Sequence, residues 1–117
     1  MSTMTIFRRG SKGHTFRLGI AATDLAIAQQ DDFWTDKLDV YVVQREVSGD
    51  KARVTGQIMG LRLKPATYQR YLHDSIPFNQ VLEPSTETGS VRIVVVDENS
   101  GRMGSVTIPA ADLAAKP

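Results

Sequence analysis

Residues 91–108 read VRIVVVDENSGRMGSVTI. The run before the turn is almost entirely β-branched, which is typical of a strand. The polar stretch 97–101 is a turn sequence, and Gly101 suits the left-handed backbone position of a short hairpin loop. After the turn, Val106 and Ile108 alternate with small polar residues, as in a strand with one buried face. The stretch therefore predicts an antiparallel hairpin in which Val106 and Ile108 point inward.

Alternation of the same kind recurs upstream of this hairpin. Residues 38–47 carry apolar side chains on both faces, as a central strand covered on two sides does. Shorter strands are expected at residues 5–8 and 76–82. Residues 14–22 predict a half-buried strand whose inward face holds Phe16, Leu18, Ile20 and Ala22.

The remaining segments interrupt or connect these strands. In residues 52–63 the alternation changes phase near Gly60, which predicts a β-bulge there. Residues 31–37 are polar and are expected to form a loop that carries the only tryptophan. Residues 24–30 fit either a strand or a helix. Residues 65–74 begin with proline, have apolar residues at helical spacing and predict one short helix.

These elements predict an all-β fold. The expected architecture is an immunoglobulin-like antiparallel β-sandwich of about seven or eight strands, with a helical crossover at residues 65–74. The sandwich is expected to span residues 14–109. Residues 1–13 are expected to be an N-terminal arm or edge strand, and residues 110–117 a C-terminal tail.

Composition excludes several functional classes. The chain has 117 residues, a formal net charge of +1 and no cysteine. Disulfides, thiolate zinc sites and cysteine nucleophiles are therefore excluded. A charge near zero gives no general attraction to nucleic acid or anionic membranes, so neither partner is expected. No apolar run is long enough for a membrane span, and the N-terminus has no apolar core of a signal peptide.

The acidic residues around the tryptophan are candidate ligands for a hard cation. Calcium prefers several carboxylate oxygens, but the spacing here matches no EF-hand, and Lys37 opposes a cation. A solvated loop is the favoured interpretation, with no metal and no cofactor. The acidic residues concerned are Asp31, Asp32, Asp36 and Asp39.

A basic N-terminal segment and the aromatic residues of the acidic loop form a candidate interaction surface. Opposite charges on the two segments favour contacts between molecules or domains, so a protein partner or neighbouring domain is expected and a homo-oligomer stays open. An exposed tryptophan also suits stacking on sugar rings, which leaves carbohydrate or small-ligand binding as the alternative. The candidate surface consists of Arg8, Arg9, Lys12, Asp31, Asp32, Phe33, Trp34 and Asp36.

No set of reactive side chains is recognisable. His73, Asp74 and Ser75 are the residue types of a hydrolase triad, but sequence neighbours point in different directions. The adjacent carboxyl groups of Asp97 and Glu98 are both expected to be solvated at a hairpin tip. We therefore expect no catalytic residues and no enzyme activity.

Three stretches resemble a known family: LDVYVVQR (38–45), LRLKPATY (61–68) and VRIVVVDENSGRMGSVTIP (91–109). Together they resemble the C-terminal module of bacterial von Willebrand factor A-related proteins, over about residues 14–109. The resemblance implies a β-sandwich accessory module of an exported protein. The Asp-x-Ser-x-Ser metal motif of that family's A domain does not occur in this chain. A non-enzymatic interaction module is the function that these observations favour.

Overall fold

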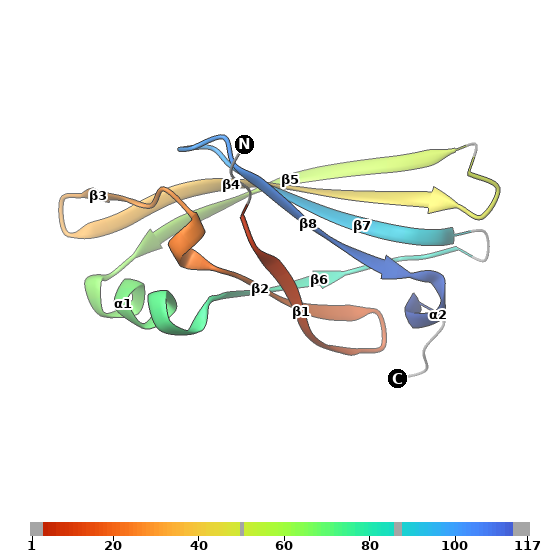
Figure 1. Cartoon of the computed structure of the whole chain (residues 1–117), viewed down its shortest axis with the longest axis horizontal. Helices are drawn as coiled ribbons and strands as arrows, with labels where there is room; N and C mark the ends of the chain where they lie inside the picture. The colour runs from red at the N-terminus through yellow and green to blue at the C-terminus, as the bar shows by residue number, and fades with distance from the viewer. Residues whose placement is uncertain (1–3, 50, 86–87, 114–117) are drawn as a thin grey trace.

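Two antiparallel β-sheets lie face to face and bury the apolar residues between them (Figure 1). The structure is a computed structural model and describes residues 4–49, 51–85 and 88–113. The smaller sheet has the strand order β1-β2-β6. The larger sheet has the order β3-β4-β7-β8, and β5 pairs with the other edge of β4. This arrangement confirms the predicted antiparallel sandwich, and its strand order is that of immunoglobulin-like domains.

The strands and helices of the described residues follow one another with short connections. The smaller sheet is formed by β1 Ile6–Lys12, β2 Thr15–Ile20 and β6 Ile76–Val81. The larger sheet is formed by β3 Ala28–Gln30, β4 Phe33–Glu46, β5 Ala52–Leu63, β7 Thr88–Asp97 and β8 Met103–Pro109. The helical elements are the 3-10 turn η1 Ala22–Asp24, α1 Pro65–Asp74 and α2 Ala110–Leu113.

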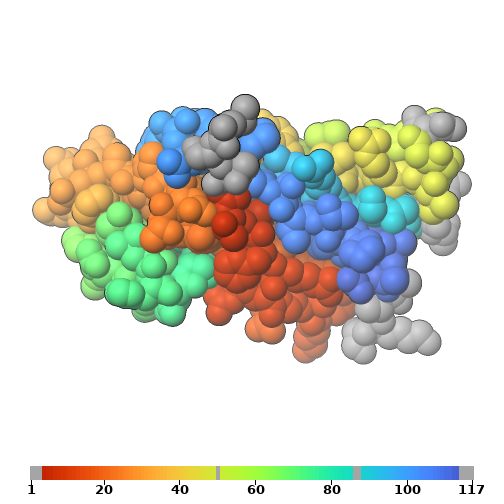
Figure 2. All heavy atoms as spheres, in the orientation of Figure 1, coloured from red at the N-terminus to blue at the C-terminus, as the bar shows by residue number. Residues whose placement is uncertain are grey.

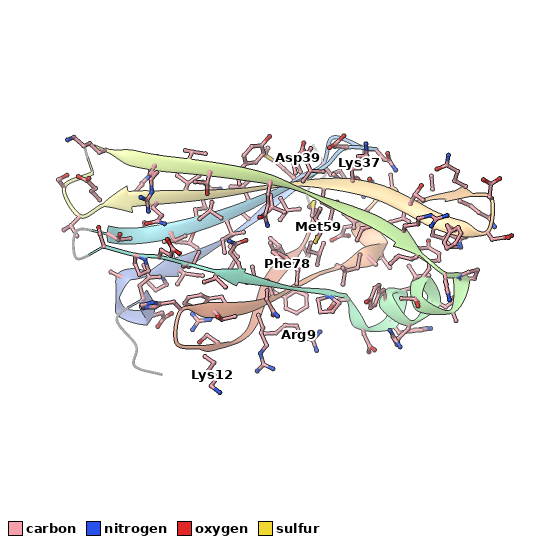
Figure 3. All side chains as sticks on the ribbon, turned by 180° about the vertical axis from the view of Figure 1, so that it is seen from behind. Arg9, Lys12, Lys37, Asp39, Met59 and Phe78 are labelled. Atoms are coloured by element: carbon pink, nitrogen blue, oxygen red, sulfur yellow. The ribbon has the colours of Figure 1, made fainter. Side chains whose placement is uncertain are left out.

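The long strand β4 organises the larger sheet. Its pleat sends Leu38, Val40 and Val42 inward, where all three are buried. Across the interior they meet the predicted inward face of β2. Figure 3 shows Met59 of β5 and Phe78 of β6 pointing into the space between the two sheets. The fully buried core side chains include Phe16, Leu18, Ile20, Val91, Ile93, Val95 and Ile108.

The C-terminal hairpin has the predicted form. The Gly101 amide donates to the Asp97 carbonyl at 2.7 Å, and Gly101 has a φ of 77°, in the left-handed region. Ile108 is fully buried and Val106 packs against the core. The prediction of this hairpin from residues 91–108 is confirmed.

Two local predictions were wrong. β4 begins at Phe33, so most of the expected loop at residues 31–37 is strand. Its polar residues alternate, with Lys37 exposed on the outer face and Asp36 buried on the inner face. The predicted bulge near Gly60 is also absent, since the pairing of β4 with β5 has no register shift. The apolar pattern changes phase because Val54 and Ile58 lie on the outer face, whereas Leu61 is buried on the inner face.

Helix α1 spans the predicted residues and carries the chain from one sheet to the other. Pro65 stands at its first turn, where the missing amide hydrogen costs nothing. Tyr68, Tyr71 and Leu72 pack against the core from the helix. In Figure 1 the helix lies beside the end of the larger sheet where β4 begins. The ambiguous stretch 24–30 contains the end of η1 and the short strand β3.

The N-terminal segment covers the outer edge of β8. The Met4 amide donates to the Met103 carbonyl at 3.1 Å, and β1 contacts β8. A Cβ atom at Gly104 would collide with the Met4 carbonyl oxygen, so glycine allows this crossing. Figure 2 shows the residues of β1 (red) beside those of β8 (blue). The expected N-terminal arm is thus an edge strand of the sandwich. The predicted tail is described only as far as Leu113, which is buried.

None of the described helices is long and apolar enough to cross a membrane.

Candidate functional site

The alternation of β4 separates the acidic residues that lie together in the sequence. Asp31 and Asp32 are exposed at the turn before β4. Asp36 points inward and is buried, and Asp39 lies on the opposite face of the strand. Among the residues that the structure describes, no three His, Cys, Asp or Glu side chains are placed to hold a metal ion. These four carboxyl groups therefore do not converge.

Phe33 and Trp34 join the start of β4 to neighbouring elements. The ring of Trp34 stacks on Tyr68 of α1, with centroids 4.1 Å apart and planes at 13°. The guanidinium of Arg62 lies 3.7 Å from the centre of the Phe33 ring. One face of each aromatic ring is covered by these contacts. Trp34 therefore docks the helix onto the sheet.

The basic residues of the candidate surface divide between an edge and the outer face of the smaller sheet. Arg8 forms a salt bridge with Asp112 of α2. Arg9 lies 3.5 Å from the Ser75 hydroxyl and, with Arg17, lines a hollow of about 460 Å³. In Figure 3, Arg9 and Lys12 project from the side opposite Lys37 and Asp39. The basic patch and the acidic residues of the larger sheet thus lie on different sides of the domain.

The residues of the hydrolase alternative do not form a triad. His73 and Asp74 are exposed at the end of α1, whereas Ser75 is buried with a φ of 120°. His14 lies at another place in the fold, with Nε2 2.9 Å from the Leu113 carbonyl oxygen. No nucleophile and base are brought together by these residues.

A buried pair of carboxyl groups was missed by the sequence analysis. Asp97 was expected to be solvated, but it is fully buried. It pairs with Leu38 in the register of β7 and β4, which makes Asp36 its diagonal neighbour on the inward face. Only Glu98, the next residue, is exposed as expected. The error arose because the end of β7 was assigned to the hairpin tip.

Hydrogen bonds explain how Asp97 is tolerated in the interior. Its Oδ2 accepts from the Ala26 amide at 2.8 Å and the Ser100 hydroxyl at 2.6 Å. Its Oδ1 accepts from the Asn99 amide at 3.2 Å. Burial acts to raise the pKa of Asp97, but hydrogen bonds from Asp36, Ser100 and the two amides hold it below its ordinary value. Asp97 therefore remains charged and joins the segment before β3 to the hairpin turn after β7.

Asp36 is the protonated member of the pair. Burial raises its pKa to about 7, and the hydrogen bond and negative charge of Asp97 act in the same direction. Its Oδ1 accepts from the Lys37 amide, while its buried Oδ2 has no donor. A proton on Oδ2 would satisfy both that atom and Asp97. The pair is thus a structural element of the interior.

The outer face of the larger sheet carries an apolar patch among charged and polar side chains, and no described element covers it extensively. We use this name for the outward side chains of β5, β4, β7 and β8. Ile58 is 68% exposed, Val54 59% and Met103 49%. Tyr41 lies opposite both Gly56 and Val94, and its ring rests 3.2 Å from where a Cβ of Gly56 would stand.

A shallow hollow of about 310 Å³ lies on the same face. Its lining is partly apolar and partly basic. Within it the Arg92 guanidinium donates to the Ser105 hydroxyl at 3.0 Å. The lining residues are Val43, Arg45, Ser90, Arg92, Val94 and Thr107. The sequence signal for this exposed face was the presence of apolar side chains on both faces of residues 38–47. That pattern predicts a strand covered on both sides, whereas the outer face is uncovered among the described residues.

The free edge of the larger sheet is β5. Among the described strands, β5 pairs only with β4, along twelve consecutive residue pairs. Ala52 through Ile58 are all exposed. No other element makes an extensive contact with this strand. One edge of the sheet is therefore covered by the N-terminal segment, and the other is open.

Comparisons with family models, with curated proteins and with solved structures found no match for this chain.

Proposed function

We propose that this chain is a non-enzymatic β-sandwich module that binds a protein partner or a neighbouring domain. The observation that carries the proposal is the uncovered apolar patch on the outer face of the larger sheet. Antiparallel sheets commonly leave one face to water, and that face is then mostly polar. Here Val54, Ile58 and Tyr41 form an exposed apolar patch among the charged and polar residues of the face.

The energetics favour a covered outer face. Burying a Val or Ile side chain fully is worth roughly 1.5–3 kcal/mol relative to leaving it exposed. Val54 and Ile58 lie four residues apart on one strand, beside Tyr41 and Val43 of the next. Contiguous apolar surface of this kind marks sites of protein interaction. A partner that covers these side chains gains from their burial.

The cellular context in the proposal comes from the sequence resemblance. A C-terminal module of a von Willebrand factor A-related protein would act outside the cytoplasm, as an accessory part of a larger exported protein. The outer face would then contact another domain of that protein or a separate exported protein. The aromatic residues first assigned to the surface, Phe33 and Trp34, contribute to packing at one end of the sheet.

Site-specific photo-crosslinking tests the proposal. A photoreactive phenylalanine analogue replaces Val54 in the protein expressed in its native cells, with Asn79 on the opposite sheet as the control position. We expect one defined product from position 54, identified by mass spectrometry, and none from position 79. Ile58→Lys in the same chain should abolish the product without changing the melting temperature, because residue 58 is exposed. Equal crosslinking from both positions, or none from position 54, would contradict the proposal.

A further inference from the structure

We propose that β5 binds an extended segment of another protein by strand addition, and that acidic residues flank the apolar centre of that segment. The inference rests on the proposed function and names its partner chemistry. The added strand would pair with the free edge of β5 and place side chains against the outer face. Three features of β5 support it.

The main chain of β5 is open for pairing along its outer edge. A strand at the edge of a sheet presents a row of backbone donors and acceptors without strand partners. Natural proteins protect such edges with proline, bulges, charged side chains or covering segments. Residues 52–63 contain no proline, the β4–β5 ladder has no bulge, and the charged residues of the strand are Arg53 and Arg62. The opposite edge of the sheet shows the contrast, since residues near Met4 cover β8.

The side chains next to this edge offer apolar sites for alternate residues of an added strand. Val54 and Ile58 project to the outer face with Gly56 between them. Because Gly56 has no side chain, the Tyr41 ring reaches over it toward the edge. A strand laid beside β5 would place every second side chain against this row. Main-chain bonds would then give affinity and these contacts selectivity.

The charge of the edge identifies the partner. Residues 51–64 contain four cationic residues and no aspartate or glutamate, namely Lys51, Arg53, Arg62 and Lys64. Arg62 is held in place by its contact with Phe33. Two copies paired through β5 would bring eight cations, four from each copy, along one junction, with no aspartate or glutamate within residues 51–64 of either copy. Like charges facing each other oppose pairing, so a strand with acidic flanks fits this edge better than a second copy does.

Peptide binding tests the inference directly. The probes are two synthetic twelve-residue peptides with the same alternating Val and Thr centre, one with Glu pairs at both ends and one with Lys pairs. We expect the Glu-flanked peptide to bind the chain and the Lys-flanked peptide to bind at least about tenfold more weakly, by isothermal titration calorimetry. Hydrogen exchange should show protection of β5 amides by the Glu-flanked peptide. Backbone N-methylation of that peptide should abolish binding, since it removes the donors of the added strand.

A variant with reversed charges on β5 distinguishes charge-directed strand addition from nonspecific peptide binding. Arg53→Glu combined with Arg62→Glu leaves two cations and two acids along residues 51–64, so the two peptides should then bind about equally. Asp32→Lys, at the exposed turn before β4, is the matched control and should leave the preference unchanged. Equal binding of both peptides to the unmodified chain, or no exchange protection in β5, would overturn the inference. Dimerisation of the chain through β5 in sedimentation experiments would overturn it in favour of a second copy.

The two proposals fail separately. If crosslinking from position 54 persists while no peptide binds, strand addition is refuted and the interaction function stands. If both fail, the interaction function is refuted as well.

Discussion

Asp36 of β4 and Asp97 of β7 are diagonal neighbours on the inward face of two paired strands, and both are buried between the sheets. The pKa of Asp36 is about 7, well above its ordinary value of 3.8, and that of Asp97 is lowered. One proton shared by the pair therefore contributes to the stability of the fold at and below neutral pH.

This pair makes the stability of the domain fall as pH rises toward and through neutrality. The folded state holds a proton on Asp36 that the unfolded state has released above about pH 4, so raising the pH favours unfolding until the folded group also ionises near pH 7. The lowered pKa of Asp97 acts in the opposite sense, but only at acidic pH. Asp36→Asn keeps a hydrogen-bond donor toward Asp97 and removes the titration. We expect the variant to match the parent below about pH 4 and to exceed its unfolding free energy by about 1–3 kcal/mol at pH 8.

Urea denaturation across this pH range measures the difference. Asp32→Asn, at an exposed turn position, is the control and should follow the parent at every pH. Parallel pH profiles of the parent and Asp36→Asn would show that Asp36 is not the titrating group.

Loss of the Asp97 carboxylate should destabilise the domain strongly. Asp97→Ala leaves the Ala26 and Asn99 amides and the Ser100 hydroxyl without their acceptor. Hydrogen bonds to a charged group contribute about 1.5–3 kcal/mol each, so we expect a loss of about 3 kcal/mol or more. Chemical denaturation provides the measurement. Glu98→Ala, at the neighbouring exposed position, should change stability by less than about 0.5 kcal/mol, and an equal effect at both positions would refute the assignment.

Adjacent residues in β7 should respond very differently to truncation. Ile93 is fully buried, whereas Val94 points to the outer face. Ile93→Ala should cost about 2–5 kcal/mol through lost burial and the cavity left behind. Val94→Ala removes fewer carbon atoms, and removes them from the uncovered outer face. It should lower the unfolding free energy by less than about 1 kcal/mol. A thermal melt of Ile93→Ala that coincides with the parent would show that the core is wrongly assigned.

The stacking of Trp34 on Tyr68 predicts the fluorescence of the only tryptophan. Tyr68→Ala exposes the indole of Trp34 to water, so the emission maximum should shift to longer wavelength. The variant should also lose about 0.5–1.5 kcal/mol of unfolding free energy from the aromatic pair, in addition to the loss from reduced burial. Gln69→Ala, at an exposed position of the same helix, should leave the emission unchanged.

The same signal tests the carbohydrate alternative. Because one face of Trp34 is already covered by Tyr68, we expect no change in emission when the chain is titrated with a panel of glycans. A saturable shift with any glycan would instead support a sugar-binding role.

Local patterns were sufficient to predict much of the fold. Helix α1 coincides with residues 65–74 because proline and the spacing of Tyr68, Tyr71 and Leu72 are local signals. The hairpin around Gly101 was predicted for the same reason. The site was predicted less well, because Asp36 and Asp97 are 61 positions apart (97 − 36) and meet only when β4 pairs with β7. The prediction of a bulge at Gly60 was wrong because two structures give the same shift in the apolar alternation. Either the backbone bulges, or the apolar residues move from the outer face of the strand to the inner face.

The sequence by itself determined most of the strands, the turn at Gly101 and the crossover helix, since alternation, proline and glycine act on the backbone over a few residues. Only the tertiary structure decided that Asp97 is buried, that β8 is covered and that β5 is left open. The physical reason is that burial depends on which strands pair, and those partners are distant in the chain. The apolar outward side chains of residues 38–47 illustrate this limit of the sequence. The same pattern fits a strand that is covered on both faces and a strand whose outer face is exposed.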